Sequence, residues 1–270
     1  DGAHATTDGL TVTDAANRGV AVLAAGALLS GLVVERAVDV GVQITDATAE
    51  VRVEDSTLTD CGTSGLAATG EMAEGLTLRN LTVSGTYDAG FELAIGVHLY
   101  QTGALIEGLT SRENQGPGLQ VEQSGARLMG ATLLDNGGPG AVLVEAIGEV
   151  ALDDLNAERN GGAGVLAVRS EATLTRPVLV ANRAVDIEGP GDGASAFVQS
   201  VLNVHGGLAL ENAGSGLAAS VGSTLSLADG VRLEGNQRYG AEVGCDGSVL
   251  SPPDEAEYAG NRLGDRNACP

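Results

Sequence analysis

The chain has 270 residues and a formal net charge of −22, with 36 acidic residues against 14 basic ones, all of them Arg. This charge excludes the classes of protein that hold nucleic acid or anionic membrane surfaces through basic patches. No apolar segment reaches the roughly 18–20 residues of a membrane span, residues 19–34 coming nearest, and no signal peptide is recognisable.

The composition favours a core built from small side chains. Hydrophobic residues make up 43% of the chain, but aromatic residues make up only 2%, and there are 41 Gly residues. This is about twice the usual ~7% of Gly in globular proteins. Such a composition suits thin, closely stacked layers better than a bulky globular centre.

An internal repeat runs along the chain. Residues 114–122, 136–145 and 160–169 read NQGPGLQVE, NGGPGAVLVE and NGGAGVLAVR. The repeats are aligned on the residue before each apolar alternation: Gly19, Gly41, Gly65, Gly90, Gly118, Gly140, Gly164, Val185, Gly216 and Gly240. Most of these starts are 21 to 25 residues apart, and the two long turns, after Gly90 and after Val185, have 28 and 31. We expect the chain to start inside its first repeat, so that an N-terminal segment has been removed.

Each repeat contains two runs that alternate apolar and polar residues, as in residues 118–139. Alternation at period two predicts strands with one buried face. Two such short strands cannot bury their apolar side alone, but stacked repeats can, with each strand parallel to its equivalent in the next repeat. The sequence therefore predicts an all-β solenoid of about ten turns, of 21–31 residues each, over residues 1–244.

A polar residue precedes most repeat starts. These residues are Asn17, Asp39, Asp60, Asn114, Asn136, Asn160, Asn182, Asn212 and Asn236. Asn tolerates the left-handed backbone conformation, and its side-chain amide can bond to the same amide one turn along. We therefore expect a structural ladder made by Asn114, Asn136, Asn160, Asn182, Asn212 and Asn236.

Two other solenoids share parts of this pattern and stay open as alternatives. The run LxxLxLxxN is also typical of leucine-rich repeats. Here, however, Asn is followed by a glycine turn and a second strand. The calcium-binding nonapeptide repeat begins GGxGxD, but Val142 and Leu166 stand where its Asp would be.

The three cysteines predict one disulfide. Cys245 and Cys269 are 24 residues apart, which is one repeat. One strand spacing of ~4.8 Å lies within reach of a disulfide. Residues 245–270 lose the alternation, so we expect them to form a C-terminal cap pinned by this bond. Cys61 lies about eight turns away and should be an unpaired, buried thiol. A structural disulfide indicates an oxidising compartment.

The repeat length and the Asn–Gly punctuation over residues 10–245 resemble the right-handed parallel β-helix proteins of the pectate lyase-like superfamily. Pectate lyases, polygalacturonases, epimerases, phage tailspikes and many bacterial surface proteins share that fold. The resemblance implies a right-handed, single-stranded parallel β-helix. It specifies a fold rather than an activity.

One cluster of residues could carry chemistry. Aligned on the Asn, the residues Asp153, Asp154, Arg176 and His205 fall in neighbouring columns of three successive turns. Their DD and HGG elements loosely resemble those of polygalacturonases, in which one carboxyl group acts as general acid while another activates water. Other polygalacturonase elements have no counterpart here. The simpler interpretation is a surface ion pair between Asp154 and Arg176. His98 and His205 lie in the two long turns, too far apart to share a site.

Two functions follow from these observations. The main prediction is an acidic, rigid, non-enzymatic structural or interaction module, secreted or on the cell surface, with no cofactor or metal. Extracellular, periplasmic and surface locations stay open, and a surface protein or a glycan is the partner class that remains. The alternative is a polysaccharide hydrolase or lyase acting around Asp154.

Overall fold

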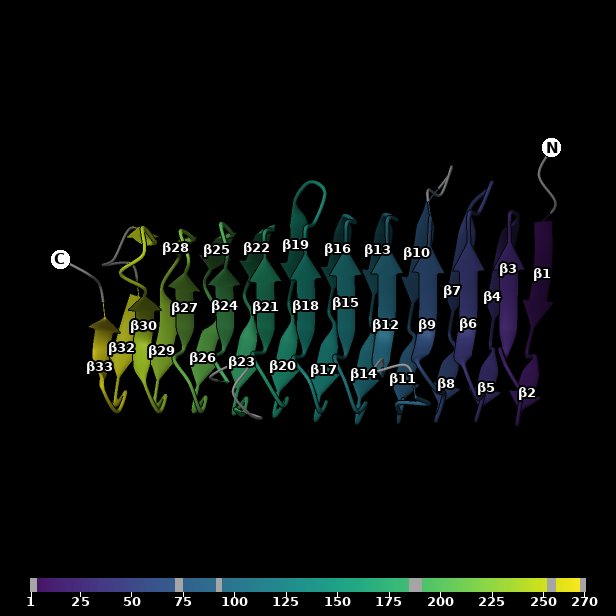
Figure 1. Ribbon diagram of the computed structural model, residues 1–270, viewed down its shortest axis with the longest axis horizontal. Helices are drawn as coiled ribbons and strands as arrows, with labels where there is room; N and C mark the ends of the chain where they lie inside the picture. The colour runs from purple at the N-terminus through teal and green to yellow at the C-terminus, as the bar shows by residue number, and fades with distance from the viewer. Residues whose placement is uncertain (1–3, 71–74, 91–93, 185–190, 252–255, 268–270) are drawn as a thin grey trace.

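The computed structural model describes residues 4–70, 75–90, 94–184, 191–251 and 256–267. Within these residues there are 33 β-strands in three parallel sheets of 11 strands and no helix. The chain visits sheets A, B and C in turn, so that each turn adds one strand to each sheet and the sheets run the length of a rod (Figure 1). The two termini lie at opposite ends of the rod. Among these residues, no helix is long and apolar enough to cross a membrane.

The strands of the three sheets follow in chain order. Sheet A contains β1 (His4–Asp8), β4 (Gly26–Ser30), β7 (Val51–Glu54), β10 (Leu76–Arg79), β13 (Ala104–Glu107), β16 (Ala126–Met129), β19 (Val150–Asp153), β22 (Glu171–Thr175), β25 (Val201–His205), β28 (Thr224–Ala228) and β31 (Val249–Ser251). Sheet B contains β2 (Thr11–Thr13), β5 (Val33–Glu35), β8 (Thr57–Thr59), β11 (Thr82–Ser84), β14 (Thr110–Arg112), β17 (Thr132–Leu134), β20 (Asn156–Glu158), β23 (Val178–Val180), β26 (Leu208–Leu210), β29 (Val231–Glu234) and β32 (Ala256–Ala259). Sheet C contains β3 (Val20–Leu23), β6 (Val40–Thr45), β9 (Ser64–Thr69), β12 (Ile95–Tyr100), β15 (Leu119–Glu122), β18 (Ala141–Val144), β21 (Val165–Val168), β24 (Ala194–Phe197), β27 (Leu217–Ser220), β30 (Tyr239–Val243) and β33 (Gly264–Asn267).

This architecture confirms the predicted parallel β-helix, with two refinements. Each turn has three strands, not two, because the run after each tight corner makes a separate short strand such as β17. Each sheet has 11 strands, one more than the ten aligned repeats. The additional turn comes from the C-terminal residues, whose apolar alternation is weak.

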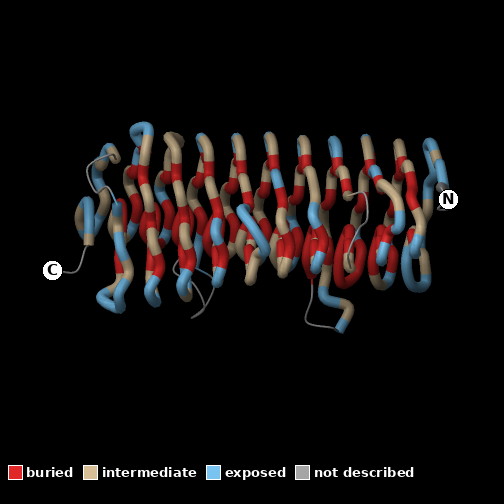
Figure 2. The backbone as a smooth tube through the Cα atoms, turned by 90° about the horizontal axis from the view of Figure 1, so that it is seen from above, coloured by how far each residue is buried: buried red, intermediate tan, exposed pale blue. Residues whose placement is uncertain are grey.

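The core is a continuous column inside the rod. Along each strand buried and solvent-facing residues alternate, as in β16, where Leu128 is buried between Arg127 and Met129. Buried residues line the inside along the rod except in the turns at its two ends, while the exposed ones gather at the corners and at these ends (Figure 2). The largest fully buried side chains are Leu and Ile, and many other core positions are Ala or Val. The small-residue composition is therefore explained by three sheets that face one narrow interior.

The asparagine ladder is confirmed, and it is one residue longer than predicted. Each amide Nδ2 donates to the Oδ1 of the next Asn at 2.8–3.1 Å, from Asn114 through to Asn236. Asn236 then donates to Asn261 at 2.9 Å. In earlier turns, Thr86, Cys61 and Ala37 occupy this column. Three of the polar residues that precede repeat starts therefore lie outside the ladder: Asn17, Asp39 and Asp60.

A column of glycines beside the ladder sets the register, and it corrects two of the predicted repeat starts. A Cβ on Gly140 would lie 2.6 Å from the backbone oxygen of Gly164, so a side chain cannot fit there. The column passes through Gly96, not Gly90, and through Gly193. The other predicted start, Val185, lies outside the described residues. The long turns are therefore those that end at Gly96 and Gly193.

The C-terminal residues form the last turn of the helix. Strands β31, β32 and β33 pair in parallel with β28, β29 and β30, and their residues are mostly exposed or half-buried. Cys61 is a free, buried thiol, as predicted. Cys269 lies outside the described residues, so its bond to Cys245 stays a prediction.

Candidate active site

Asp154 and Arg176 form an exposed ion pair of a kind that recurs along the rod. The Arg176 guanidinium donates Nε and Nη2 to the two carboxylate oxygens of Asp154, at 2.8 and 2.7 Å. Both residues have positive φ and stand at the same corner of successive turns. Three other corner pairs repeat this arrangement of an acid and an Arg one turn later: Asp14–Arg36, Asp135–Arg159 and Glu145–Arg169. Because four such pairs occur at separate places, their role is to link the corners of successive turns, and the Asp154–Arg176 pair needs no catalytic explanation.

The other two residues of the predicted cluster have different partners. Asp153 pairs with Arg127 at 3.3 Å, and His205 lies 3.2 Å from the carboxylate of Asp229. Asp153 and His205 share a column of sheet A, but Thr175 stands between them. The structure thus joins Asp154 to Arg176 and does not bring the four side chains together.

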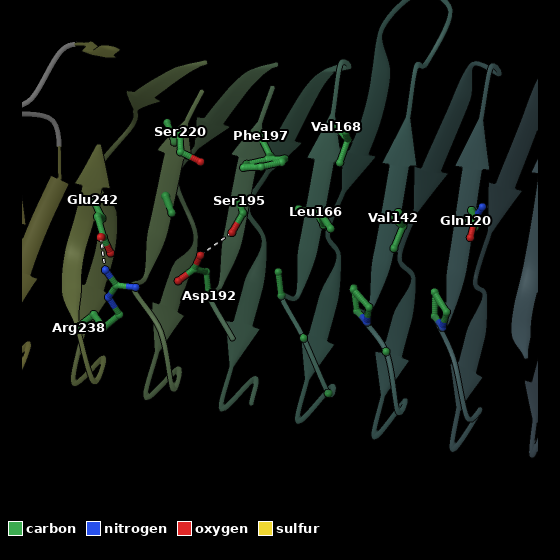
Figure 3. Close-up of a pocket in the computed structure, with 18 of the residues that line it drawn as sticks. Gln120, Val142, Leu166, Val168, Asp192, Ser195, Phe197, Ser220, Arg238 and Glu242 are labelled. Carbon is green, nitrogen blue, oxygen red and sulfur yellow. Dashed lines mark hydrogen bonds and ion pairs between the residues drawn. The ribbon is translucent and has the colours of Figure 1, made fainter. Parts of the chain in front are cut away.

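A groove lies elsewhere, on the outward face of sheet C. It has a volume of about 860 Å³ and runs across the strands from Gln120 on β15 to Glu242 on β30 (Figure 3). Six neighbouring strands span roughly 24 Å at one strand spacing per turn. Its middle is apolar, because Val142, Leu166 and Val168 face outward there. A long apolar groove along the axis can hold an extended chain molecule.

Polar side chains converge at the C-terminal end of this groove. The Ser195 hydroxyl donates to Asp192 Oδ2, and the Ser215 backbone N–H donates to Asp192 Oδ1, both at 2.6 Å. The Ser215 hydroxyl donates to Glu242 Oε2, also at 2.6 Å. The second oxygen of Glu242 accepts a bond from Arg238. Two carboxyl groups from turns two apart are thereby held through one serine.

Asp192 has the properties of an acid–base group. Its residue is 1% exposed although it lines the groove. Burial raises the pKa of its carboxyl group to about 6, against the bonds from Ser195 and Ser215, and the nearby Glu242 carboxylate raises it further. A carboxyl group in a cleft whose pKa lies near neutrality is typical of general acids and bases.

Phe197 supplies an aromatic surface beside this cluster. It ends β24 and is 42% exposed, with Val168 and Ser220 as its neighbours in the adjacent strands. The corner that follows has two consecutive left-handed residues, Val198 at φ 51° and Gln199 at φ 56°. A β-branched residue rarely adopts this conformation, and such backbone strain concentrates at functional sites. The same corner of the preceding turn has one left-handed residue.

Within the described residues, no group of three His, Cys, Asp or Glu side chains is placed to hold a metal ion. The charged residues among those that line the groove are Asp192, Arg238 and Glu242. The polar groups gathered at this end of the groove are the carboxyl groups of Asp192 and Glu242, the Arg238 guanidinium and the hydroxyls of Ser195, Ser215 and Ser220.

Sequence reasoning missed this site because it placed a repeat start at Val185. Asp192 then falls between two repeats, in the glycine-rich stretch GPGDG of residues 189–193. With the start at Gly193, Asp192 falls in the column of residues that precede the glycines, where Pro139 and Ala163 stand in earlier turns and Ser215 in the next. With the correct alignment, an Asp in a column otherwise made of small or apolar residues would have marked Asp192 as a candidate site residue.

Solved structures share this fold. The crystal structure of the periplasmic alginate epimerase AlgG matches with a TM-score of 0.66 and 12% identity, over 91% of this chain and 61% of that chain. The catalytic unit of a thermostable alpha-1,3-glucanase from Streptomyces thermodiastaticus matches with a TM-score of 0.53 and 12% identity, over 95% of this chain and 50% of that one. No protein-family model and no curated protein matches the sequence.

The likeness defines the class by its fold alone: the chain is a parallel β-helix, as the sequence predicts. It spans less than two thirds of the length of either of these solved chains. The main functional prediction, a non-enzymatic module, is wrong: the two solved structures above are those of polysaccharide-active enzymes, which favours the alternative prediction. Their activities bear on this chain as a proposal.

Proposed function

We propose that the chain is a polysaccharide-active enzyme whose active site is the end of the sheet C groove around Asp192 and Glu242. The observation that carries this proposal is the buried Asp192 carboxyl group, linked through Ser215 to a second carboxylate at the end of a long groove. The polysaccharide-active enzymes of similar fold support it.

Asp192 and Glu242 suit the two roles of acid–base hydrolysis. The raised pKa lets Asp192 carry a proton near neutral pH, and this proton passes to the oxygen of the glycosidic bond as that bond breaks. Glu242, positioned by Arg238 and the Ser215 hydroxyl, accepts a proton from the water whose oxygen bonds to the sugar carbon. Two carboxyl groups that divide the roles in this way are the usual machinery of glycoside hydrolases.

The groove favours a neutral glycan over an acidic one. Among its described lining residues, Arg238 is the one cation, and it is already bonded to Glu242. An acidic polymer would meet two carboxyl groups and a protein of net charge −22 without an unpaired cation in return. Elimination or epimerisation at C5 needs a uronic acid, whose carboxyl group acidifies the C5 proton. A neutral substrate therefore points to hydrolysis.

A location outside the cytoplasm completes the proposal. A polysaccharide substrate and the predicted disulfide both belong to that environment. The alginate epimerase of similar fold is periplasmic.

The proposal is tested by incubating the protein with a panel of neutral and acidic polysaccharides. We expect new reducing ends from a neutral glycan and no unsaturated products. The Asp192→Asn variant should be inactive while its circular dichroism spectrum stays that of a folded β-helix. A panel without turnover, or an equally active variant, would reject the site.

A further inference from the structure

The middle of the sheet C groove is lined without polar side chains. On the turns of β18 and β21, every described residue that lines the groove is Gly, Pro, Ala, Val or Leu. Val142 and Leu166, which are direct partners on these two strands, form the floor together with Val168. The two turns cover about 10 Å of the groove at one strand spacing per turn. This length of the groove offers aliphatic contacts to a ligand that lies in it.

Polar residues border this aliphatic floor on both sides. In the column of Val142 and Leu166, Gln120 stands one turn before and Ser195 one turn after. Val142 and Leu166 are only half-buried and alternate with fully buried residues, so they lie on the solvent side of their strands. Apolar surface in a groove with a polar border is typical of a binding site. The floor therefore continues the binding groove that ends at the active site.

The glycine-rich wall beside this floor uses backbone N–H groups within the protein. Those of Gly137, Gly138 and Gly161 donate to carbonyl oxygens of the preceding turn, at 2.7, 3.1 and 2.7 Å. Pro139, which lines the same wall, has no N–H group. A sugar hydroxyl turned toward this part of the groove would lose its bonds to water and find no side chain to replace them, which is unfavourable. The groove thus disfavours a sugar unit with free hydroxyls on the side that faces the floor.

We propose that the substrate is a neutral glycan with O-acyl groups, such as acetyl esters, and that these groups lie over Val142, Leu166 and Val168. An acetyl ester replaces the donor of a hydroxyl with an apolar methyl group, which packs against Val and Leu side chains. Among the described residues that line these turns there is no aromatic ring on which an unsubstituted sugar ring could stack. The ester is uncharged, in agreement with a neutral substrate. The inference rests on the proposed function, because it names the substrate class of the same groove.

The acyl preference is tested by binding, with turnover removed. The Asp192→Asn protein is titrated calorimetrically with partly acetylated xylo-oligosaccharides, and with the same oligosaccharides after mild alkali has removed their acetyl esters. The acetylated form should bind more tightly, by about fourfold for each methyl group that is buried. Equal affinity for the two forms, tighter binding of the deacetylated form, or no binding of either would overturn the inference.

Variants of the floor, made in the Asp192→Asn protein, give a second readout. Leu166→Asn places a polar amide on the floor, so the preference for the acetylated form should disappear. Leu166→Met keeps the floor apolar and should keep the preference. Val180→Asn is the matched control, because Val180 is half-buried on the solvent side of β23 in sheet B, outside the groove. A preference that persists in Leu166→Asn, or that disappears equally in Val180→Asn, would show that the floor does not bind the acyl groups.

The outcomes separate this inference from the proposed function and from a second occupant. Turnover of a neutral polysaccharide, together with equal affinity for the two forms, would support the enzyme and reject the acyl preference. Preference for the acetylated form, in a protein that turns over no polysaccharide with or without acetyl esters, would reject the enzyme and support acyl binding. A second copy of the chain could also cover an apolar floor. A dimer in sedimentation that dissociates in Leu166→Asn would overturn the inference in favour of that copy.

Discussion

Asp192 and Glu242, which lie two turns apart, are joined through one residue: Ser215 donates its backbone N–H to the first and its hydroxyl to the second. Because the Asp192 carboxyl group is buried beside the Glu242 carboxylate, its ionisation is unfavourable. A neutral side chain in place of Asp192 would make the folded protein more stable, so the carboxyl group at the end of the groove is kept at a cost in stability. Stability and activity should therefore respond oppositely to its removal.

The first prediction is that Asp192→Asn stabilises the protein above pH 6. The pKa of Asp192 is raised from 3.8 to about 6, so between these values the folded state keeps a proton that the unfolded chain loses. The wild type consequently loses stability, relative to the variant, as pH rises through this range. At about 1.4 kcal/mol per pKa unit, the difference approaches roughly 3 kcal/mol at pH 8.

Urea unfolding of both proteins at pH 4 and pH 8 measures this difference. Asp154→Asn is the matched control with the opposite sign, because bonds from Arg176 lower the pKa of Asp154. That variant should lose stability relative to the wild type as pH rises from strongly acid to neutral. A difference between wild type and Asp192→Asn that is independent of pH would contradict the pKa of Asp192.

The second prediction concerns the pH dependence of turnover. If Asp192 donates a proton, the enzyme needs it protonated, so kcat/KM should fall as pH rises through about 6. The Ser195→Ala variant removes a hydrogen bond that favours the charged form. Its alkaline limb should therefore move to higher pH. A limb that stays in place in this variant would show that another group sets it.

The third prediction is that an Asn→Ala substitution lowers the free energy of unfolding more in the middle of the asparagine ladder than at its end. Asn160→Ala leaves two buried donors of Asn136, its backbone N–H and its Nδ2, without their acceptor. We expect a loss of about 3 kcal/mol or more, since each unsatisfied buried group costs about 1–3 kcal/mol. Asn261→Ala removes the last, partly exposed rung, where water can replace the bonds, and should cost about 1 kcal/mol. Equal losses in urea unfolding would argue against a buried ladder.

The fourth prediction concerns the cysteines. Burial raises the pKa of the Cys61 thiol to about 11, so it should not react with alkylating reagents in the native protein. Unfolding without reductant should expose one reactive thiol, and unfolding with reductant three. Three reactive thiols without reductant would exclude the Cys245–Cys269 disulfide, which peptide mapping would otherwise locate.

Much of the fold could be predicted because one-dimensional repetition leaves a strong sequence signal. An Asn followed by a glycine turn, as at Asn136 and Asn160, recurs at nearly constant spacing. A solenoid keeps such a pattern because its stability comes from contacts between neighbouring turns. The alignment failed where a turn carries an insertion: Gly90 and Val185 were taken as starts in place of Gly96 and Gly193. In such turns the pattern does not say which residues are inserted.

The site could not be predicted because it depends on which residues share a face across turns. The adjacent acids Asp153 and Asp154 attracted notice in the sequence, yet they point to different arginines. Asp192 and Glu242 are 50 residues apart and meet only through the register of sheet C. The raised pKa of Asp192 arises from burial, which a sequence pattern of this kind does not report.

The central claim, that chemistry occurs at Asp192 and not at the exposed Asp154, is tested most directly by comparing two variants on one neutral polysaccharide. Both replace a carboxylate by an amide. Asp154 lies at the corner that follows β19, and Asp192 lies just before β24. Release of reducing ends should fall by at least a hundredfold in Asp192→Asn, as expected on loss of a general acid, and stay at the wild-type rate in Asp154→Asn. Activity that survives in Asp192→Asn and disappears in a folded Asp154→Asn would contradict the account.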